Sequence, residues 1–156
     1  MPDSLTANAI PQEVPRLVDQ ERVRQAVERA ELHYVSDEHG NIALPWRIVT
    51  MQIVFQDVRA LQMRGMWHRI ASMEYIDDLR ALAMQWNAHR IGPKAHVSID
   101  DDGRVSLHGE YTVPIRAGMT DTQLDYFLQT GVRLLMALMM QAEEVFPDPL
   151  IAVVEE

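Results

Sequence analysis

The sequence predicts an α+β domain, a two-layer structure in which an antiparallel sheet carries helices on one face. Three observations predict this class. Apolar residues recur every three or four positions in three segments, which is typical of helices with one buried side. In other segments they alternate with polar residues, which is typical of strands with one buried face. Short turns link these strands, and short turns join antiparallel neighbours, so the predicted order is α-β-β-β-β-α-β-β-α.

The first helix and the first hairpin are predicted in the N-terminal third of the chain. Asp19 belongs to the residue types that cap helix N-termini. Two short apolar runs, 33–36 and 42–46, flank residues 38–41, where glycine and asparagine favour a turn. An apolar stripe at helical spacing predicts the helix, and it is formed by Val23, Ala26, Val27 and Ala30.

Residues 48–56 and 61–69 are the clearest strand predictions. Apolar residues or glycine occupy the odd positions from 49 to 55 and from 61 to 67. Pairing Phe55 with Leu61 across a loop at 57–59 places both apolar sets on one face, as the register of a half-buried hairpin requires.

A second helix is predicted from Ser72, a capping residue type, to the break at Gly92-Pro93. Its apolar face consists of five residues that share one side of a helix: Ile76, Leu79, Leu82, Ala83 and Trp86.

A second strand pair is predicted over residues 94–99 and 104–113. The three-residue loop between them ends in Gly103, at the position where a positive φ is needed. The register that follows sets His96 opposite His108, and it also sets Lys94 opposite Glu110.

The third helix is predicted from a capping box of Thr120 and Gln123 to about Val145, where Pro147 and Pro149 stop it. Its segment 134–140 is apolar in every direction, and a helix that is apolar all round is buried all round. One side can cover the sheet. We expect the other side to contact a partner, most simply a second copy of the chain, through Leu135, Met136, Met139 and Met140.

The sheet offers further candidates for that contact. Three apolar residues are predicted to point outward, away from the helices, and belong to the partner or dimer surface: Ile48, Val54 and Met66. An alternative is that the first helix or the C-terminal tail covers the free side of the third helix. The predicted division is a flexible arm at 1–15, a single domain at 16–146 and a tail at 147–156.

Composition excludes several classes of protein and site. The chain has 156 residues and no cysteine, which excludes disulfides, thiolate nucleophiles and cysteine-based zinc sites. A net charge of −9 without a lysine or arginine cluster argues against nucleic-acid partners and anionic membranes. We find neither an apolar run long enough to span a bilayer nor a signal peptide, so a cytoplasmic protein is expected.

Catalytic motifs are missing from the sequence. It contains no nucleophile elbow, Walker A loop, dinucleotide fingerprint or zinc-protease motif, so we expect no enzyme, no catalytic residues and no cofactor. An alternative function rests on His96 and His108, which as cross-strand neighbours could sense pH by mutual repulsion or share a metal. Zinc normally needs four ligands, so no metal site is assigned.

The chain resembles the YbjN-like family, whose members are described as bacterial sensory transduction regulators. The likeness covers residues 19–146 and is carried by Trp86-Asn87, Lys94, the turn at 102–104, Gly118-Met119-Thr120 and the long helix to Phe146. The resemblance implies a fold like that of type III secretion chaperones, a compact domain that often dimerises, and no catalytic residues. The predicted function is therefore a non-enzymatic, homodimeric, chaperone- or adaptor-like regulator that binds an unidentified protein.

Overall fold

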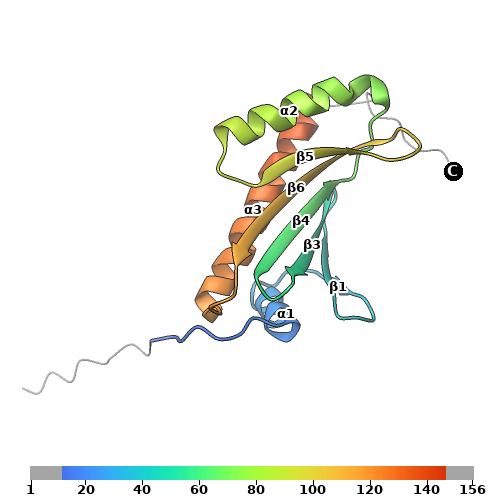
Figure 1. Cartoon of the computed structure of the whole chain (residues 1–156). Coiled ribbons are helices and arrows are strands. Elements are labelled where there is room, and N and C mark those ends of the chain that lie inside the picture. Colours follow the sequence, from blue (N-terminus) through green and yellow to red (C-terminus); the bar gives the residue numbers. More distant parts are fainter. Residues whose placement is uncertain (1–11, 147–156) are drawn as a thin grey trace, which may run out of the picture.

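The structure, a computed structural model, describes residues 12–146 and confirms the predicted class and order of elements (Figure 1). Six strands form one antiparallel sheet in the order β1-β2-β3-β4-β6-β5. The helices are α1 (Gln20–Arg29), α2 (Ile76–His89) and α3 (Asp121–Val145). The strands are β1 (Val35–Ser36), β2 (Ile42–Pro45), β3 (Val49–Gln56), β4 (Ala60–Trp67), β5 (Lys94–Ile99) and β6 (Val105–Pro114).

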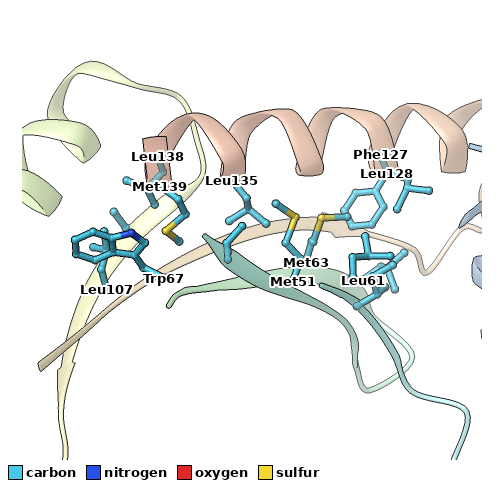
Figure 2. Close-up of a cluster of buried hydrophobic side chains, with 14 of the residues drawn as sticks. Met51, Leu61, Met63, Trp67, Leu107, Phe127, Leu128, Leu135, Leu138 and Met139 are labelled. Atoms are coloured by element: carbon cyan, nitrogen blue, oxygen red, sulfur yellow. The ribbon is translucent and has the colours of Figure 1, made fainter. Parts of the chain in front are cut away.

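The core lies between the sheet and α3. Figure 1 shows α3 running along one face of the sheet, with α2 beside β5. The odd-numbered residues of β3, β4 and β6 point towards α3, as the alternation predicts. Side chains from both layers are fully or almost fully buried and meet there (Figure 2), among them Met51, Leu61, Met63, Trp67, Leu107, Phe127, Leu128, Leu135, Leu138 and Met139.

The predicted registers are confirmed in both hairpins. Phe55 is the partner of Leu61 across β3 and β4. His96 is the partner of His108 across β5 and β6. Gly103 has a φ of 75°, which explains why a glycine closes the second hairpin.

The start of the second helix differs from its prediction. A 3-10 turn, η1 (Met73–Tyr75), follows Ser72, and α2 begins only at Ile76. The Ser72 hydroxyl donates to the Glu74 carboxylate at 3.1 Å and makes no capping bond to the backbone. By contrast, the capping box of Thr120 and Gln123 forms as predicted.

Two glycines let α3 approach the sheet closely. Gly65 of β4 and Gly109 of β6 are cross-strand partners. A Cβ atom on Gly109 would lie 2.7 Å from the Leu135 Cδ2 atom, and one on Gly65 would lie 3.2 Å from the same atom. Leu135 therefore fills the space that two missing side chains leave.

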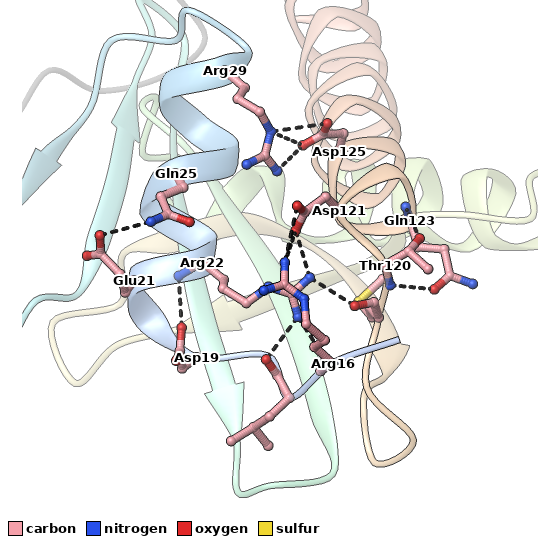
Figure 3. A network of polar contacts seen from close by, with 12 residues as sticks. Arg16, Asp19, Glu21, Arg22, Gln25, Arg29, Thr120, Asp121, Gln123 and Asp125 are labelled. Atoms are coloured by element: carbon pink, nitrogen blue, oxygen red, sulfur yellow. Dashed lines mark hydrogen bonds and ion pairs between the residues drawn. The ribbon is translucent and has the colours of Figure 1, made fainter. Parts of the chain in front are cut away.

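The N-terminal segment is fixed by the buried guanidinium of Arg22 (Figure 3). It donates to the carbonyl oxygens of Arg16, Leu17 and Met119 at 2.8–2.9 Å and to the Asp121 carboxylate at 2.8 Å. The backbones of Arg16 and Met119 also exchange hydrogen bonds. These contacts tie α1 and the segment before it to the start of α3.

Candidate interaction surfaces

The structure separates the four residues predicted for the partner-facing side of α3. Leu135 and Met139 have no exposed surface, because they face the sheet of their own chain. Met136 is half-buried, and Met140 is 59% exposed. Leu135 and Met139 therefore belong to the core of their own chain, and of the four residues only Met136 and Met140 remain accessible to a partner.

The three sheet residues predicted to face outward do not form one patch. Ile48, just before β3, is half-buried and packs against the core. Val54 is half-buried, whereas Met66 is 46% exposed, and both lie on the face opposite α3. Val54 pairs with Gln62 and Met66 with Thr50, four residues away along β3, and polar side chains lie between them. This open face is therefore mainly polar, and it is separate from the Met136–Met140 surface.

The open face also carries the predicted histidine pair. The rings of His96 and His108 stack with centroids 4.9 Å apart and planes 8° from parallel. The Ser98 hydroxyl lies 2.7 Å from Nε2 of His108. Burial lowers the pKa of His108, the neighbouring His96 lowers it further, and Glu110 opposes both effects.

The structure gives no support to a metal site at this pair. Among residues 12–146, no three histidine, aspartate or glutamate side chains are grouped closely enough to hold a metal ion. His68 bonds instead to the Thr50 hydroxyl at 2.8 Å and to the Arg47 carbonyl at 3.0 Å.

A more apolar site lies where β6 continues past the end of its neighbour. β5 pairs with β6 only as far as the pair Lys94 and Glu110, whereas β6 runs on to Pro114. Beside this end is an open groove of about 470 Å³, which we call the β6–α3 groove. It is lined by Tyr111, Val113, Pro114, Gly118, Met119, Thr122, Gln123, Tyr126 and Phe127.

Three aromatic side chains belong to the lining of the β6–α3 groove. The rings of Tyr111 and Phe127 stack with centroids 5.4 Å apart. Tyr126 is 66% exposed at the rim. Burial raises the pKa of the Tyr111 hydroxyl, and the nearby Tyr126 adds to the effect. The groove thus offers a stacked aromatic wall and a polar edge to a ligand.

The backbone of β6 leaves hydrogen-bonding groups at the sheet edge beside the groove. Val105 exchanges backbone bonds with Ala71 on the β4 side, so the odd residues of β6 direct their N–H and C=O groups to that side. By the same alternation, Thr112 directs its N–H and C=O towards the side of β5, beyond the last residue with which β5 pairs. Within residues 12–146 no strand lies next to Thr112 on that side.

Sequence reasoning missed the β6–α3 groove, although a signal was present. The two predicted strands, 94–99 and 104–113, differ in length, and the excess of the longer one leaves part of its edge unpaired. The sequence analysis considered only which face of each strand is buried. It did not compare the lengths of paired strands.

None of the helices in residues 12–146 has the length and apolar character that crossing a membrane requires. None of the curated proteins matches the chain significantly.

Solved structures with a similar fold are known. The crystal structure of YbjN from E. coli aligns with a TM-score of 0.73 at 17% identity, covering 83% of this chain and 95% of that one. A chain of the HopA1-SchA chaperone-effector complex aligns with a TM-score of 0.51 at 18% identity, covering 81% and 98%. The Yersinia pestis type III secretion chaperone SycH is more distant, with a TM-score of 0.43 at 14% identity and a coverage of 76% and 98%.

The sequence profile of one family matches residues 19–140, which is most of the described structure. The elements inside this range run from α1 to the sixth turn of α3, so they include the whole sheet. The chain therefore belongs to the YbjN family, described as "Putative bacterial sensory transduction regulator".

Proposed function

We propose that the chain is a non-enzymatic, chaperone- or adaptor-like regulator of the cytoplasm that binds an extended apolar segment of a protein partner in the β6–α3 groove. The observation that carries this proposal is the unpaired end of β6 beside an aromatic groove of about 470 Å³. A peptide that adds a strand to a sheet edge gains backbone hydrogen bonds, and its alternate side chains enter pockets.

The groove fits this mode of binding in two ways. Thr112 offers one N–H and one C=O to an added strand, while Pro114, which lacks an N–H, limits the pairing to a short stretch. The alternate side chains of the added strand would then contact Tyr111, Val113 and Tyr126. Because only a short stretch of backbone can pair, the aromatic side chains supply most of the contact with the bound segment. The net charge of −9 favours partner segments with basic flanks.

The fold supports the same class of function. A chain of a chaperone-effector complex shares it, with a TM-score of 0.51 over 81% of this chain. That likeness concerns the fold alone, so the groove carries the argument for binding.

The groove is tested with peptides selected from a random ten-residue display library. We expect enriched sequences to alternate apolar residues, and we expect Tyr126→Asp and Thr112→Pro to weaken their binding at least tenfold in fluorescence anisotropy. Gln129→Asp adds the same charge to the exposed surface of α3 and should leave binding unchanged. Selected peptides that bind both groove variants as well as the wild type, or a library without enrichment, would overturn the proposal.

We further propose that the chain acts as a homodimer through the exposed side of α3 at Met136 and Met140. Met140 is 59% exposed near the C-terminal end of a helix whose opposite side is already buried. Two neighbouring methionines on the free side of a long helix offer apolar contacts to a second copy of the chain. Val54 and Met66, on the open face of the sheet, are the competing candidates.

Light scattering on three proteins tests the dimer. The wild type is expected to have the mass of a dimer, and the double variant Met136→Glu, Met140→Glu that of a folded monomer. Met140→Glu alone is a milder variant, because Met136 is half-buried and its replacement affects packing. The double variant Val54→Glu, Met66→Glu is expected to remain dimeric. A monomeric wild type, or dissociation only of the Val54 and Met66 variant, would contradict the proposal.

A further inference from the structure

A second groove, of about 520 Å³, lies between α2 and the last turn of α3. We call it the α2–α3 groove. Its floor contains Trp86, and Val145 at its wall is 47% exposed. The groove is lined by Asp78, Ala81, Leu82, Gln85, Trp86, His89, Arg90, Gln141, Val145 and Phe146.

The described part of the chain ends at the wall of this groove. Phe146 is itself a lining residue, and its buried ring lies 6.1 Å from that of Trp67. The lining residues of α2 span Asp78 to Arg90, roughly 18 Å of helix at 1.5 Å per residue. Residues 150–154 follow Phe146 by four to eight positions, and an extended chain of that length reaches about 13–26 Å. The segment can therefore lie along the whole groove.

The composition of residues 147–156 suits this placement. Pro147 and Pro149 stop α3 and favour an extended chain. The next five residues, Leu-Ile-Ala-Val-Val at 150–154, are all apolar. Only three residues separate them from the groove wall, so their effective concentration at the groove is on the order of millimolar.

Charge gives the segment a direction. Glu155 and Glu156 follow the apolar run, and residues 147–156 include no basic residue. One end of the α2–α3 groove carries His89 and Arg90, whose guanidinium carbon lies 5.0 Å from the centroid of the Trp86 ring. The other end carries Asp78. The two glutamates are therefore attracted to the Arg90 end and repelled from the Asp78 end.

We propose that residues 150–154 dock in the α2–α3 groove of their own chain, with Glu155 and Glu156 beside Arg90. The docked segment covers Val145, which is 47% exposed without it.

The absence of cysteine from the chain makes a direct test possible. A nitroxide on the single cysteine of Val153→Cys labels the full-length protein at one position. We expect it to broaden the Trp86 indole N–H and the amide signals of Ala81 and Gln85 at least twofold relative to the reduced label. Amides of α1, which packs on the opposite end of α3, serve as the internal control.

Substitutions decide whether the segment docks by the proposed contacts. Leu150→Asp with Ile151→Asp is expected to abolish the broadening. Arg90→Glu is expected to weaken it and Glu155→Lys with Glu156→Lys to restore it, whereas Arg116→Glu, on the exposed loop after β6, is the charge-matched control. Absence of broadening in the groove would overturn the proposal. So would broadening that arises only between nitroxide-labelled and isotope-labelled chains in a mixed sample, because the occupant would then be a second copy.

Discussion

The side-chain amide of Asn87 forms two hydrogen bonds with the backbone of Ala95 at the outer edge of β5. The Nδ2 group donates to the Ala95 carbonyl oxygen at 2.8 Å, and Oδ1 accepts the Ala95 N–H at 2.8 Å. This is the bonding pattern that a neighbouring strand would supply. Next to it, the Trp86 indole donates to the Pro93 carbonyl at 3.1 Å. The Trp86-Asn87 pair therefore ties α2 to β5 and blocks one position of an open sheet edge.

Asn87→Ala is expected to destabilise the fold by about 1–3 kcal/mol, because it removes both partners of the Ala95 backbone. Asn87→Asp should lose less, since a carboxylate still accepts the Ala95 N–H but repels the carbonyl. Urea unfolding followed by circular dichroism measures both losses. Gln129→Ala, on the exposed side of α3, is the control. Equal stability of the wild type and Asn87→Ala would show that the two bonds contribute nothing.

Gly109→Ala is expected to destabilise the fold by about 1–3 kcal/mol, because its methyl group would overpack the core. It would lie 2.7 Å from the Leu135 Cδ2 atom and 2.9 Å from that of Leu138. Gly65→Ala meets its nearest neighbours at 3.2 Å and should cost less. In combination with Leu135→Ala, the Gly109 variant should lose less stability than the sum of the single losses, with a coupling of about 0.5–3 kcal/mol. Strict additivity would show that Leu135 does not occupy this site.

The glycines also show why the partner surface of α3 could be predicted only in part. The apolar run 134–140 indicates burial, but the number of its sides that the sheet covers depends on how closely helix and sheet approach. Gly65 and Gly109 permit a close approach, so Leu135 enters the core together with Met139. A sequence read element by element does not show which glycines of the strands lie beneath which turn of the helix.

Alternation, by contrast, predicted the sheet well. A period of two residues excludes every register shifted by one residue, and the short loop selects among the rest, so the pairs Phe55–Leu61 and His96–His108 followed. The grooves did not follow, because they arise where elements of unequal length stop beside one another. Asn87 illustrates the same limit. Its partner is a strand residue eight positions along the chain, and its place near the end of a helix does not show that contact.

Arg22→Met is expected to destabilise the fold by about 2–4 kcal/mol, because three backbone carbonyls and one carboxylate lose a buried donor. The hydrogen bond from Arg22 is the main cause that lowers the pKa of Asp121, so the variant should also move that pKa back towards its ordinary value. Carboxyl NMR measures the second effect. Arg24→Met, on the same helix, removes exposed ion pairs with Glu21 and Glu28 and should leave the stability almost unchanged. A similar loss in both variants would contradict the role given to Arg22.

Protonation of His108 in the stacked pair is expected to destabilise the fold as the pH falls below about 6.5, the ordinary pKa of histidine. The pKa of His108 is lowered in the folded chain, so between the folded and unfolded values the unfolded chain binds more protons. The stability contributed by neutral His108 is therefore fully present above pH 6.5, and it is lost as the pH falls through the pKa of His108 in the folded chain. Urea unfolding at a series of pH values measures it.

The charged groups around the pair determine whether a substitution raises or lowers the pKa of His108. His96 on β5 lowers the pKa of His108 and Glu110 on β6 raises it, while Lys94 and Arg64 face Glu110 from the two flanking strands. His96→Gln should therefore raise the pKa of His108 and reduce the loss of stability at low pH. Glu110→Gln should lower that pKa, so the loss of stability should continue to a lower pH. Proton NMR of the His108 ring follows the titration directly, and the same midpoint in all three proteins would show that neither neighbour acts on His108.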